Sequence, residues 1–209
     1  MLREKEKQAA QCELAKIFKE ILPAVGLPER PAQMELSKKM LAAMLDNNIA
    51  LCEAGTGIGK TYAYLAAALV FNKYRKLAGL PLKPVCISTC SIALQEAIVK
   101  EYLPTLNRAL LRDGLISKPA MAAVRKGKQH YVCDIRLKRR LQCVNQDKKN
   151  PQNLAALQAM QKQLDMDGTQ KLSDFDKRQI CVPRTCNCKS KNCRYMDFLD
   201  SCSSEKYLI

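Results

Sequence analysis

A glycine-rich loop at residues 53–61 carries the clearest chemistry in this chain. It reads Glu-Ala-Gly-Thr-Gly-Ile-Gly-Lys-Thr and stands between a short apolar run and a stretch with helical periodicity. Glycines let a backbone wrap around phosphate oxygens without Cβ clashes, and the N–H groups at a helix start attract the anion. The pattern therefore predicts a nucleotide-binding loop made of Ala54, Gly55, Thr56, Gly57, Ile58, Gly59, Lys60 and Thr61.

Two side chains at the end of this loop have the chemistry for phosphoryl transfer. The Lys60 ammonium is expected to reach the β- and γ-phosphates, and the Thr61 hydroxyl is expected to ligate Mg²⁺. The strict pattern places glycine where this chain has Ala54, but Gly55 and Gly57 keep the loop permissive.

Arg30 and Gln33 precede the loop by about twenty residues, at a helix start marked by Pro31. By itself this is only a helix start. Beside a phosphate loop it gains a second meaning, because a glutamine carboxamide can donate to and accept from the adenine edge at once. We therefore expect Gln33 to select ATP over other nucleotides.

Eleven cysteines are a high count for 209 residues. The charged N-terminus leads into no apolar segment, so we expect no secretory signal, a cytoplasmic location and few disulfides. Six cysteines are scattered and are expected to act as small hydrophobes. The other five stand in a pattern that suits metal ligation: Cys133, Cys181, Cys186, Cys188 and Cys193. Four thiolates suit a [4Fe–4S] cluster or a tetrahedral zinc ion, and unmetallated thiols are the third reading.

The charge is strongly positive and unevenly spread. The formal net charge is +15, of which residues 1–80 carry +4 and residues 81–209 carry +11. Residues 125–149 hold nine basic and two acidic side chains. Such an excess predicts a polyanionic partner, most often nucleic acid, against the plainer reading of a solvated lysine-rich surface.

The periodicity of apolar residues predicts helices that alternate with short strands. Helices are expected at residues 3–22, 31–45, 59–77, 91–103 and 152–164, and buried strands at residues 49–53, 84–89 and 119–124. This alternation predicts an α/β fold with a parallel sheet. The pattern breaks after residue 124, and the tail from residue 165 is polar and cysteine-rich. No charge-free apolar run reaches 18 residues, so no transmembrane helix and no membrane partner are expected.

Several of these motifs together resemble the DinG/XPD family of iron–sulfur superfamily 2 DNA helicases. The family's Arg-x-x-Gln motif matches Arg30 and Gln33, and its phosphate loop matches residues 53–61, with Ile58 at the variable place. Residues 88–95, Ser-Thr-Cys-Ser-Ile-Ala-Leu-Gln, resemble the next helicase motif. Residues 126–133, Lys-Gly-Lys-Gln-His-Tyr-Val-Cys, resemble the family segment that supplies the first iron–sulfur ligand.

The resemblance implies a RecA-like ATP-binding motor domain at residues 1–124, an inserted and mainly helical iron–sulfur domain at 125–200, and the start of a return to the motor domain at 201–209. It implies ATP, Mg²⁺ and a [4Fe–4S] cluster held by Cys133, Cys193 and two of Cys181, Cys186 and Cys188. The implied partners are single-stranded and forked DNA, with 5′→3′ translocation. The side chains expected to contact DNA are Thr89, Gln95, Lys126, Arg136, Lys138, Arg139 and Arg140.

Two features keep alternatives open. Ser88 or Ser91 could simply cap a helix rather than mark a DNA contact. ATP hydrolysis in this class needs an apolar strand that ends in Asp-Glu, and the chain contains no Asp-Glu pair. We therefore expect an N-terminal fragment that lacks this motif and the second motor domain. The alternative function is a regulatory or decoy module that binds ATP and DNA without turnover, with cysteines that bind zinc.

Overall fold

The computed structural model describes residues 2–146, 151–167, 172–186 and 193–202 of the 209-residue chain. The described chain separates into two compact units, one up to residue 124 and one from residue 125. Each unit has its own hydrophobic core. None of the described helices is long and apolar enough to cross a membrane.

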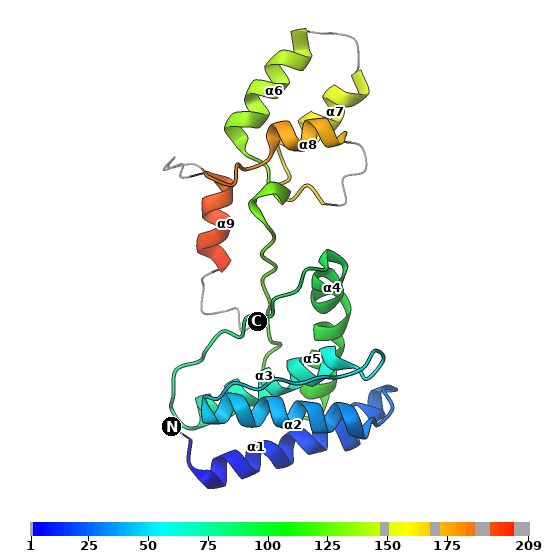
Figure 1. Ribbon diagram of the computed structural model, residues 1–209, viewed down its shortest axis with the longest axis vertical. Coiled ribbons are helices and arrows are strands. Elements are labelled where there is room, and N and C mark those ends of the chain that lie inside the picture. The colour runs from blue at the N-terminus through cyan, green and yellow to red at the C-terminus, as the bar shows by residue number, and fades with distance from the viewer. Residues whose placement is uncertain (1, 147–150, 168–171, 187–192, 203–209) are drawn as a thin grey trace. The chain divides into compact units, whose positions relative to one another are not determined.

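The first unit is built from helices (Figure 1). They are α1 (Glu4–Lys16), α2 (Pro31–Asp46), α3 (Lys60–Leu77), α4 (Ile92–Ala97) and α5 (Leu103–Arg112). Ile17–Ile21 extends α1 and Ile98–Tyr102 joins α4 to α5, each as a π-helical turn. The helices expected from the apolar periodicity are confirmed, with bounds that differ by a few residues.

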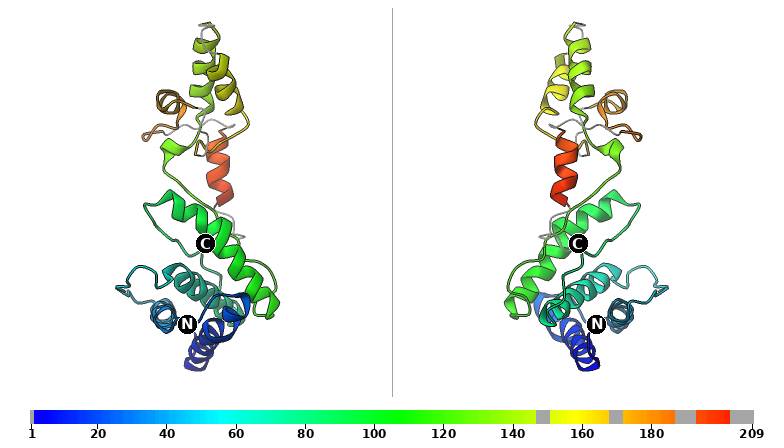
Figure 2. Two further views of the ribbon diagram at one scale, coloured as in Figure 1. Left: turned by 90° about the vertical axis from the view of Figure 1, so that its right-hand side faces the viewer. Right: turned by 90° about the vertical axis from the view of Figure 1, so that its left-hand side faces the viewer.

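The core of the first unit lies where α1, α2 and α3 pack against one another (Figure 2). Small residues of α3 allow this close approach, since Ala63, Ala66 and Ala67 are fully buried. Leu14, Leu41 and Leu65 fill the spaces between the helices and are fully buried as well. This packing fixes the start of α3, where the glycine-rich loop ends, against the side of α2.

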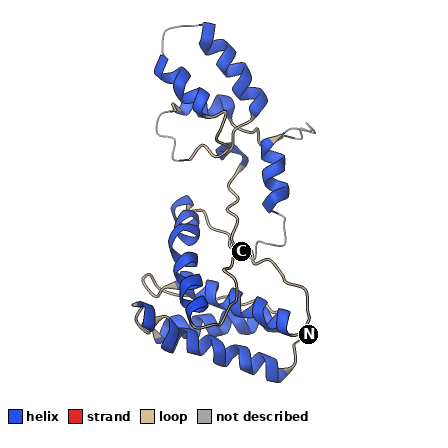
Figure 3. Cartoon of the chain, turned by 180° about the vertical axis from the view of Figure 1, so that it is seen from behind, coloured by secondary structure: helices blue, strands red, loops and turns tan. Residues whose placement is uncertain are grey.

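The expected parallel sheet is wrong. Figure 3 draws helices and loops in the described parts of the chain, where β pairing consists of isolated bridges: Tyr131↔Asp165 and Val132↔Cys181 in the second unit, and a bridge residue at Met121 in the first. Residues 49–53 and 84–89 have no strand structure, and residues 119–124 contain a single bridge residue, Met121. A strand is stabilised by backbone hydrogen bonds to a neighbouring strand. The described chain offers residues 49–53 and 84–89 no such neighbour, and Ile49 and Leu51 are fully exposed.

Buried asparagines hold two extended segments in place of a neighbouring strand. The Asn107 carboxamide donates to the Ala120 carbonyl and accepts from the Ala120 N–H, both at 2.9 Å. Asn72 bonds Lys83 in the same way, donating at 2.9 Å and accepting at 3.0 Å. A carboxamide has the same donor and acceptor as a peptide group, so each segment is attached to a helix at one residue. The apolar runs at residues 84–89 and 119–124 are nevertheless largely accessible: none of residues 84–89 is buried, and Ala120 is the one buried residue of 119–124.

The second unit contains α6 (Asp134–Gln146), α7 (Pro151–Ala159), α8 (Asp174–Ile180) and α9 (Arg194–Cys202). Its main core joins α6, α7 and α8 through Leu137, Leu157, Met160 and Ile180, all nearly fully buried. A smaller apolar cluster forms around Tyr131, Val182 and Tyr195. Helix α6 lies in the basic segment, where the apolar periodicity predicted no helix, although the resemblance implied a mainly helical domain at residues 125–200.

Candidate functional site

The glycine-rich loop leads directly into α3, whose first residue is Lys60. Gly57 and Gly59 have φ angles of +80° and +88°, in the left-handed region that favours glycine. A Cβ at Gly59 would also collide with the Gln33 carboxamide, which would have to move aside. The backbone thus turns sharply into the N-terminus of an 18-residue helix, the end that attracts anions.

Three side chains of α2 and its N-cap donate to carbonyls of the loop and of the first turn of α3. Arg30 Nη1 donates to the Gly57 carbonyl, Gln33 Nε2 to the Gly59 carbonyl and Ser37 Oγ to the Ala63 carbonyl, each at 2.7 Å. We call Arg30, Gln33 and Ser37 the α2 clamp. The spacing of three and four residues places them on one side of α2, facing the loop. Gln33 and Ser37 are buried, whereas Arg30 is exposed.

Lys60 completes the contacts on the carbonyl side of the loop. Its ammonium donates to the Ala54 carbonyl at 3.0 Å and to the Gly55 carbonyl at 2.8 Å. The C=O and the following N–H of a trans peptide point in opposite directions. Holding these carbonyls with cations and amides therefore turns the next N–H groups to the other side of the loop. Such N–H groups are suited to bind phosphate oxygens.

The remaining loop residues are accessible to a ligand. Gly55, Thr56 and Gly57 are exposed, whereas Ala54, Ile58 and Thr61 are half-buried. The structure thus brings the predicted nucleotide-binding residues of two separate motifs to one loop. The clamp residue Ser37 was not predicted from the sequence. A serine seven residues after Arg30 on the same helix face was the only signal for it.

Thr89 and Gln95 lie at the start of α4 and contact each other there. The Thr89 hydroxyl accepts from the Ser91 N–H at 3.1 Å, and the Ser91 hydroxyl accepts from the Leu94 N–H at 3.2 Å. Gln95 Nε2 donates to the Thr89 carbonyl at 3.4 Å. The plainer interpretation of this segment, a helix N-cap by Ser91, is confirmed. The DNA contacts of Thr89 and Gln95 stay a prediction.

The cysteines of the second unit divide between its two apolar clusters. Cys133, Cys186 and Cys193 pack against the cluster of Tyr131, Val182 and Tyr195. Cys181 packs against the main core instead, because its antiparallel bridge to Val132 turns both side chains to that face. Its sulfur also lies 3.9 Å from the Arg136 guanidinium. Cys188 lies outside the described residues.

The donor chemistry of these cysteines fits a soft metal centre, since thiolates are the ligands of iron–sulfur clusters and of structural zinc. Three of the five pack against one apolar cluster. Within the described ranges, however, no three Cys, His, Asp or Glu side chains come together as a group that could hold a metal ion. The ligand set therefore stays a prediction.

The four basic side chains of α6 fall into two groups, two that contact other residues and two that are exposed. Arg136 donates to the Cys181 carbonyl at 3.0 Å, and Arg140 is ion-paired with the buried Asp176 at 2.7 Å. Lys138 and Arg139 are exposed, and no described residue pairs with either. Of the predicted DNA contacts on this helix, these two are therefore the most accessible to a phosphate.

Lys126 and His130 belong to a buried polar network that the sequence did not predict. The Lys126 ammonium is 6% exposed and lies 2.7 Å from both Asp165 and Asp167. His130 Nδ1 lies 3.0 Å from Asp167. Burial raises the pKa of Asp167, but its hydrogen bonds with Lys126 and His130 together lower the pKa by more than burial raises it. The net pKa is therefore below its usual value. The charge of Lys126 is directed inward in this structure, away from a solvent-exposed phosphate.

Comparisons with known proteins give relatives of two names. The chain is 38% identical over 118 residues to the 3′-5′ exonuclease DinG of Bacillus subtilis (strain 168), which is 56% of this chain and 11% of that protein. It is 37% identical over 112 residues to the ATP-dependent DNA helicase YoaA of Escherichia coli (strain K12), which is 54% of this chain and 15% of that protein. YoaA of Haemophilus influenzae matches to the same extent.

No family model and no solved structure matches the chain. The chain spans only 11 to 15% of the length of these three relatives. Homologues named DinG and YoaA over about half of the chain nevertheless confirm the resemblance to DinG-type helicases.

Proposed function

From its similarity to DinG and YoaA proteins, we propose that this chain forms the ATP-binding part of an ATP-dependent DNA helicase of the DinG type, which translocates 5′→3′ on single-stranded DNA. One observation carries the nucleotide part of the proposal. Arg30, Gln33 and Lys60 converge on four carbonyls of one glycine-rich loop at a helix N-terminus. That arrangement leaves the opposite, N–H side of the loop for phosphate.

Each loop residue has a role in this proposal. Lys60 exchanges its carbonyl contacts for the β- and γ-phosphates when ATP binds, and Thr61 ligates Mg²⁺. Gln33 keeps one amide N–H on the Gly59 carbonyl. Its oxygen and second N–H remain for the adenine edge, which gives one side chain contact with both the loop and the base.

The cysteines hold a [4Fe–4S] cluster in this proposal, through Cys133, Cys193 and two of Cys181, Cys186 and Cys188. The cluster, when bound, supplies four iron–thiolate bonds that cross-link parts of the second unit which are distant in sequence. The contacts of Cys133, Cys186 and Cys193 with one apolar cluster support this assignment. Zinc is the competing ion, because four thiolates also satisfy its tetrahedral preference.

A second candidate function is a module that binds ATP and DNA without turnover. The absence of any Asp-Glu pair in the 209 residues favours it for the chain by itself. Phosphate release by the purified chain, with and without single-stranded DNA, separates the two. DNA-stimulated release supports turnover by the chain, whereas ATP binding without release supports the binding module.

The nucleotide site is tested by titrating the chain with Mg·ATP in a calorimeter. Lys60→Ala should abolish binding, because it removes the fixed positive charge of the loop. Lys39→Ala is the matched control, since Lys39 is an exposed lysine of α2 that faces away from the loop and pairs only weakly with Glu35 at 4.0 Å. Equal affinities of the Lys60→Ala variant and the native chain would disprove the site.

The role of Gln33 is tested with ATP and GTP in parallel. Gln33→Ala should bring the two affinities closer together, by about the 1–3 kcal/mol that a bidentate contact to a base edge contributes elsewhere. A variant that weakens both nucleotides equally would show that Gln33 only holds the loop.

A further inference from the structure

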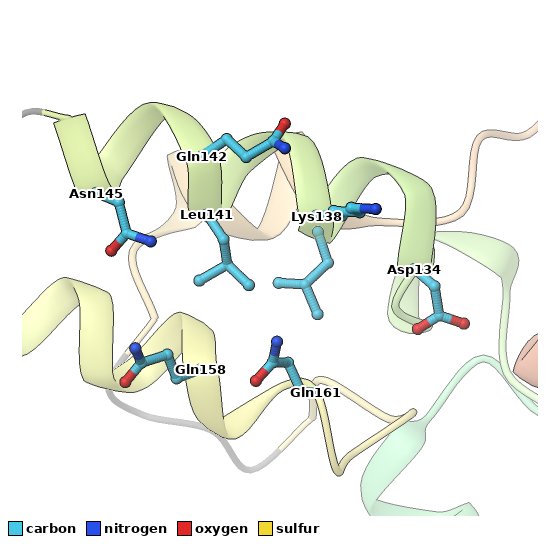
Figure 4. A pocket seen from close by; sticks show the side chains of 8 residues that line it. Asp134, Lys138, Leu141, Gln142, Asn145, Gln158 and Gln161 are labelled. Atoms are coloured by element: carbon cyan, nitrogen blue, oxygen red, sulfur yellow. The ribbon is translucent and has the colours of Figure 1, made fainter.

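A polar groove runs between α6 and α7 in the second unit (Figure 4). Its volume is about 430 Å³. Gln158 and Gln161 project from α7 and the turn after it toward α6, while Leu141 points into the gap from α6. None of the functions considered above uses this groove.

The lining combines an apolar floor with carboxamides. Leu137 and Leu141 form the floor and are 2% and 8% exposed. Four amide side chains surround it: Gln142, Asn145, Gln158 and Gln161. All four are exposed, and none has a side-chain hydrogen bond with another described residue. Each carboxamide therefore offers two donors and an acceptor to a ligand.

The charges around the groove favour an anionic ligand. Lys138 lines it, and the neighbouring Arg139 is exposed on the same helix. Asp134 is the one carboxylate of the lining, and Arg194 already neutralises it, with Nε 2.8 Å from Oδ1. Free cations beside free carboxamides match a nucleotide, whose phosphate is anionic and whose base edge carries donors and acceptors.

We propose that this groove binds an unpaired base of single-stranded DNA. The base lies against Leu137 and Leu141, the carboxamides of Gln158 and Gln161 hydrogen bond its edge, and Lys138 with Arg139 contact the flanking phosphates. Apolar side chains and edge-directed hydrogen bonds are how proteins hold a base outside a duplex. This inference rests on the proposed DNA function and adds a base-contacting site to it.

Among the described lining residues there is no aromatic ring, so the base gains no stacking of the kind that dominates many single-strand sites. The groove should therefore contribute a moderate share of DNA affinity. It should also prefer bases with both a donor and an acceptor on one edge, such as adenine, because Gln and Asn pair with these in a bidentate manner.

The test uses the full 209-residue chain and fluorescein-labelled 15-nucleotide strands followed by fluorescence anisotropy. One strand is oligo-dA, and the other has the same length with abasic sites throughout. The variant is Gln158→Ala with Gln161→Ala, and the control is Gln152→Ala, an exposed glutamine of α7 that does not line the groove. Circular dichroism verifies that each variant keeps its helices.

The double variant should weaken oligo-dA binding by about fivefold or more, with no change for the abasic strand. Lys138→Ala with Arg139→Ala should weaken both strands alike and make binding less dependent on salt. Hydrogen exchange of α6 and α7 should slow on binding oligo-dA but not on binding the abasic strand.

Other outcomes overturn the proposal in distinguishable ways. Equal binding of oligo-dA and abasic strands, unchanged in the double variant, would refute the base site while DNA binding itself stands. No binding of either strand would refute the DNA function together with the site. A double variant with unchanged DNA binding but an altered oligomeric state would assign the groove to a contact between copies of the chain.

Discussion

The two candidate sites of this chain are assembled in different ways. The nucleotide loop is continuous in sequence, and Arg30 and Gln33 hold it from the start of α2 while Ser37 holds the first turn of α3. The five candidate ligand cysteines are spread over some sixty residues. Those that the structure describes are divided between two apolar clusters. A site formed by consecutive residues of one loop is positioned by its own backbone. A site whose ligands are far apart in the sequence depends on tertiary contacts or on the metal itself.

The two units also differ in how their folds are held. In the first unit, tightly packed helices with buried alanines form a large apolar core. The second unit has a smaller core, and both units contain part-buried ion pairs, such as Arg140 with Asp176 in the second and Lys73 with Glu13 in the first. The basic segment therefore has an apolar core of its own.

The largest expected effect separates the two units by metal content. Cys133→Ser should remove most iron and the broad visible absorbance of anaerobically purified protein, because one of four thiolates is lost. ATP affinity should stay unchanged, since the phosphate loop belongs to the other unit. Iron analysis, absorbance and calorimetry measure these quantities.

Cys143→Ser is the control for that experiment, because Cys143 is an exposed cysteine of α6. If the native protein is colourless and carries stoichiometric zinc, the cysteines bind zinc and not an iron–sulfur cluster. A loss of ATP affinity in the Cys133→Ser variant would show that the two sites are coupled.

Gly59→Ala tests the close contact between the loop and the α2 clamp. Left-handed backbone costs a residue with a Cβ about 1–2 kcal/mol, and this Cβ would also collide with the Gln33 amide. ATP affinity should therefore fall by roughly tenfold or more. Gly57→Ala is the matched comparison, because Gly57 has φ +80° but nothing within 4 Å of an added Cβ. Equal losses in the two variants would mean that backbone strain alone matters.

Ser37→Ala should have a smaller effect on the same site. It removes a buried hydrogen bond to the Ala63 carbonyl, worth about 0.5–1.5 kcal/mol of unfolding free energy. Because this bond holds the first turn of α3, ATP affinity should fall a few-fold as well. Urea unfolding and calorimetry give the two values. Lower stability with unchanged ATP affinity would assign Ser37 to packing only.

Acid should weaken the second unit through Asp176. Burial raises the pKa of Asp176, but hydrogen bonds with Ser173 and Arg140 together lower the pKa by more than burial raises it. Its net pKa therefore lies below the usual value. A lowered carboxyl pKa stabilises the fold above the unfolded pKa of about 3.9, and this stabilisation is lost as the pH falls below that value. Urea midpoints between about pH 3 and 7 should show this loss, and Asp176→Asn should reduce it. Identical pH profiles of the two proteins would contradict the assignment.

The sequence was most informative where local physics decides the structure. The apolar spacing of residues 3–22 and 31–45 predicted helices that the structure contains. The glycines of residues 53–61 predicted a sharp loop before a helix, because left-handed backbone favours glycine. Similarity to DinG and YoaA proteins likewise follows from the motifs themselves.

Longer-range features escaped prediction for physical reasons. Apolar runs at residues 49–53 and 84–89 suggest strands only if a partner strand exists, and apolar pattern alone cannot supply one. Helix α6 was missed because four basic residues surround Leu137 in the sequence, although Leu137 and Leu141, four residues apart, lie on one helix face and reach the core.

The sequence by itself determined the local conformations, the phosphate loop chemistry and the thiol donors, since each depends on residues close together in the chain. Only the tertiary structure decided that Ser37 joins the clamp, that Lys126 points inward to Asp165 and Asp167, and that Cys181 faces a different cluster from Cys133. These outcomes depend on which side of a helix or bridge meets another element. That choice is made by packing the whole unit around its core.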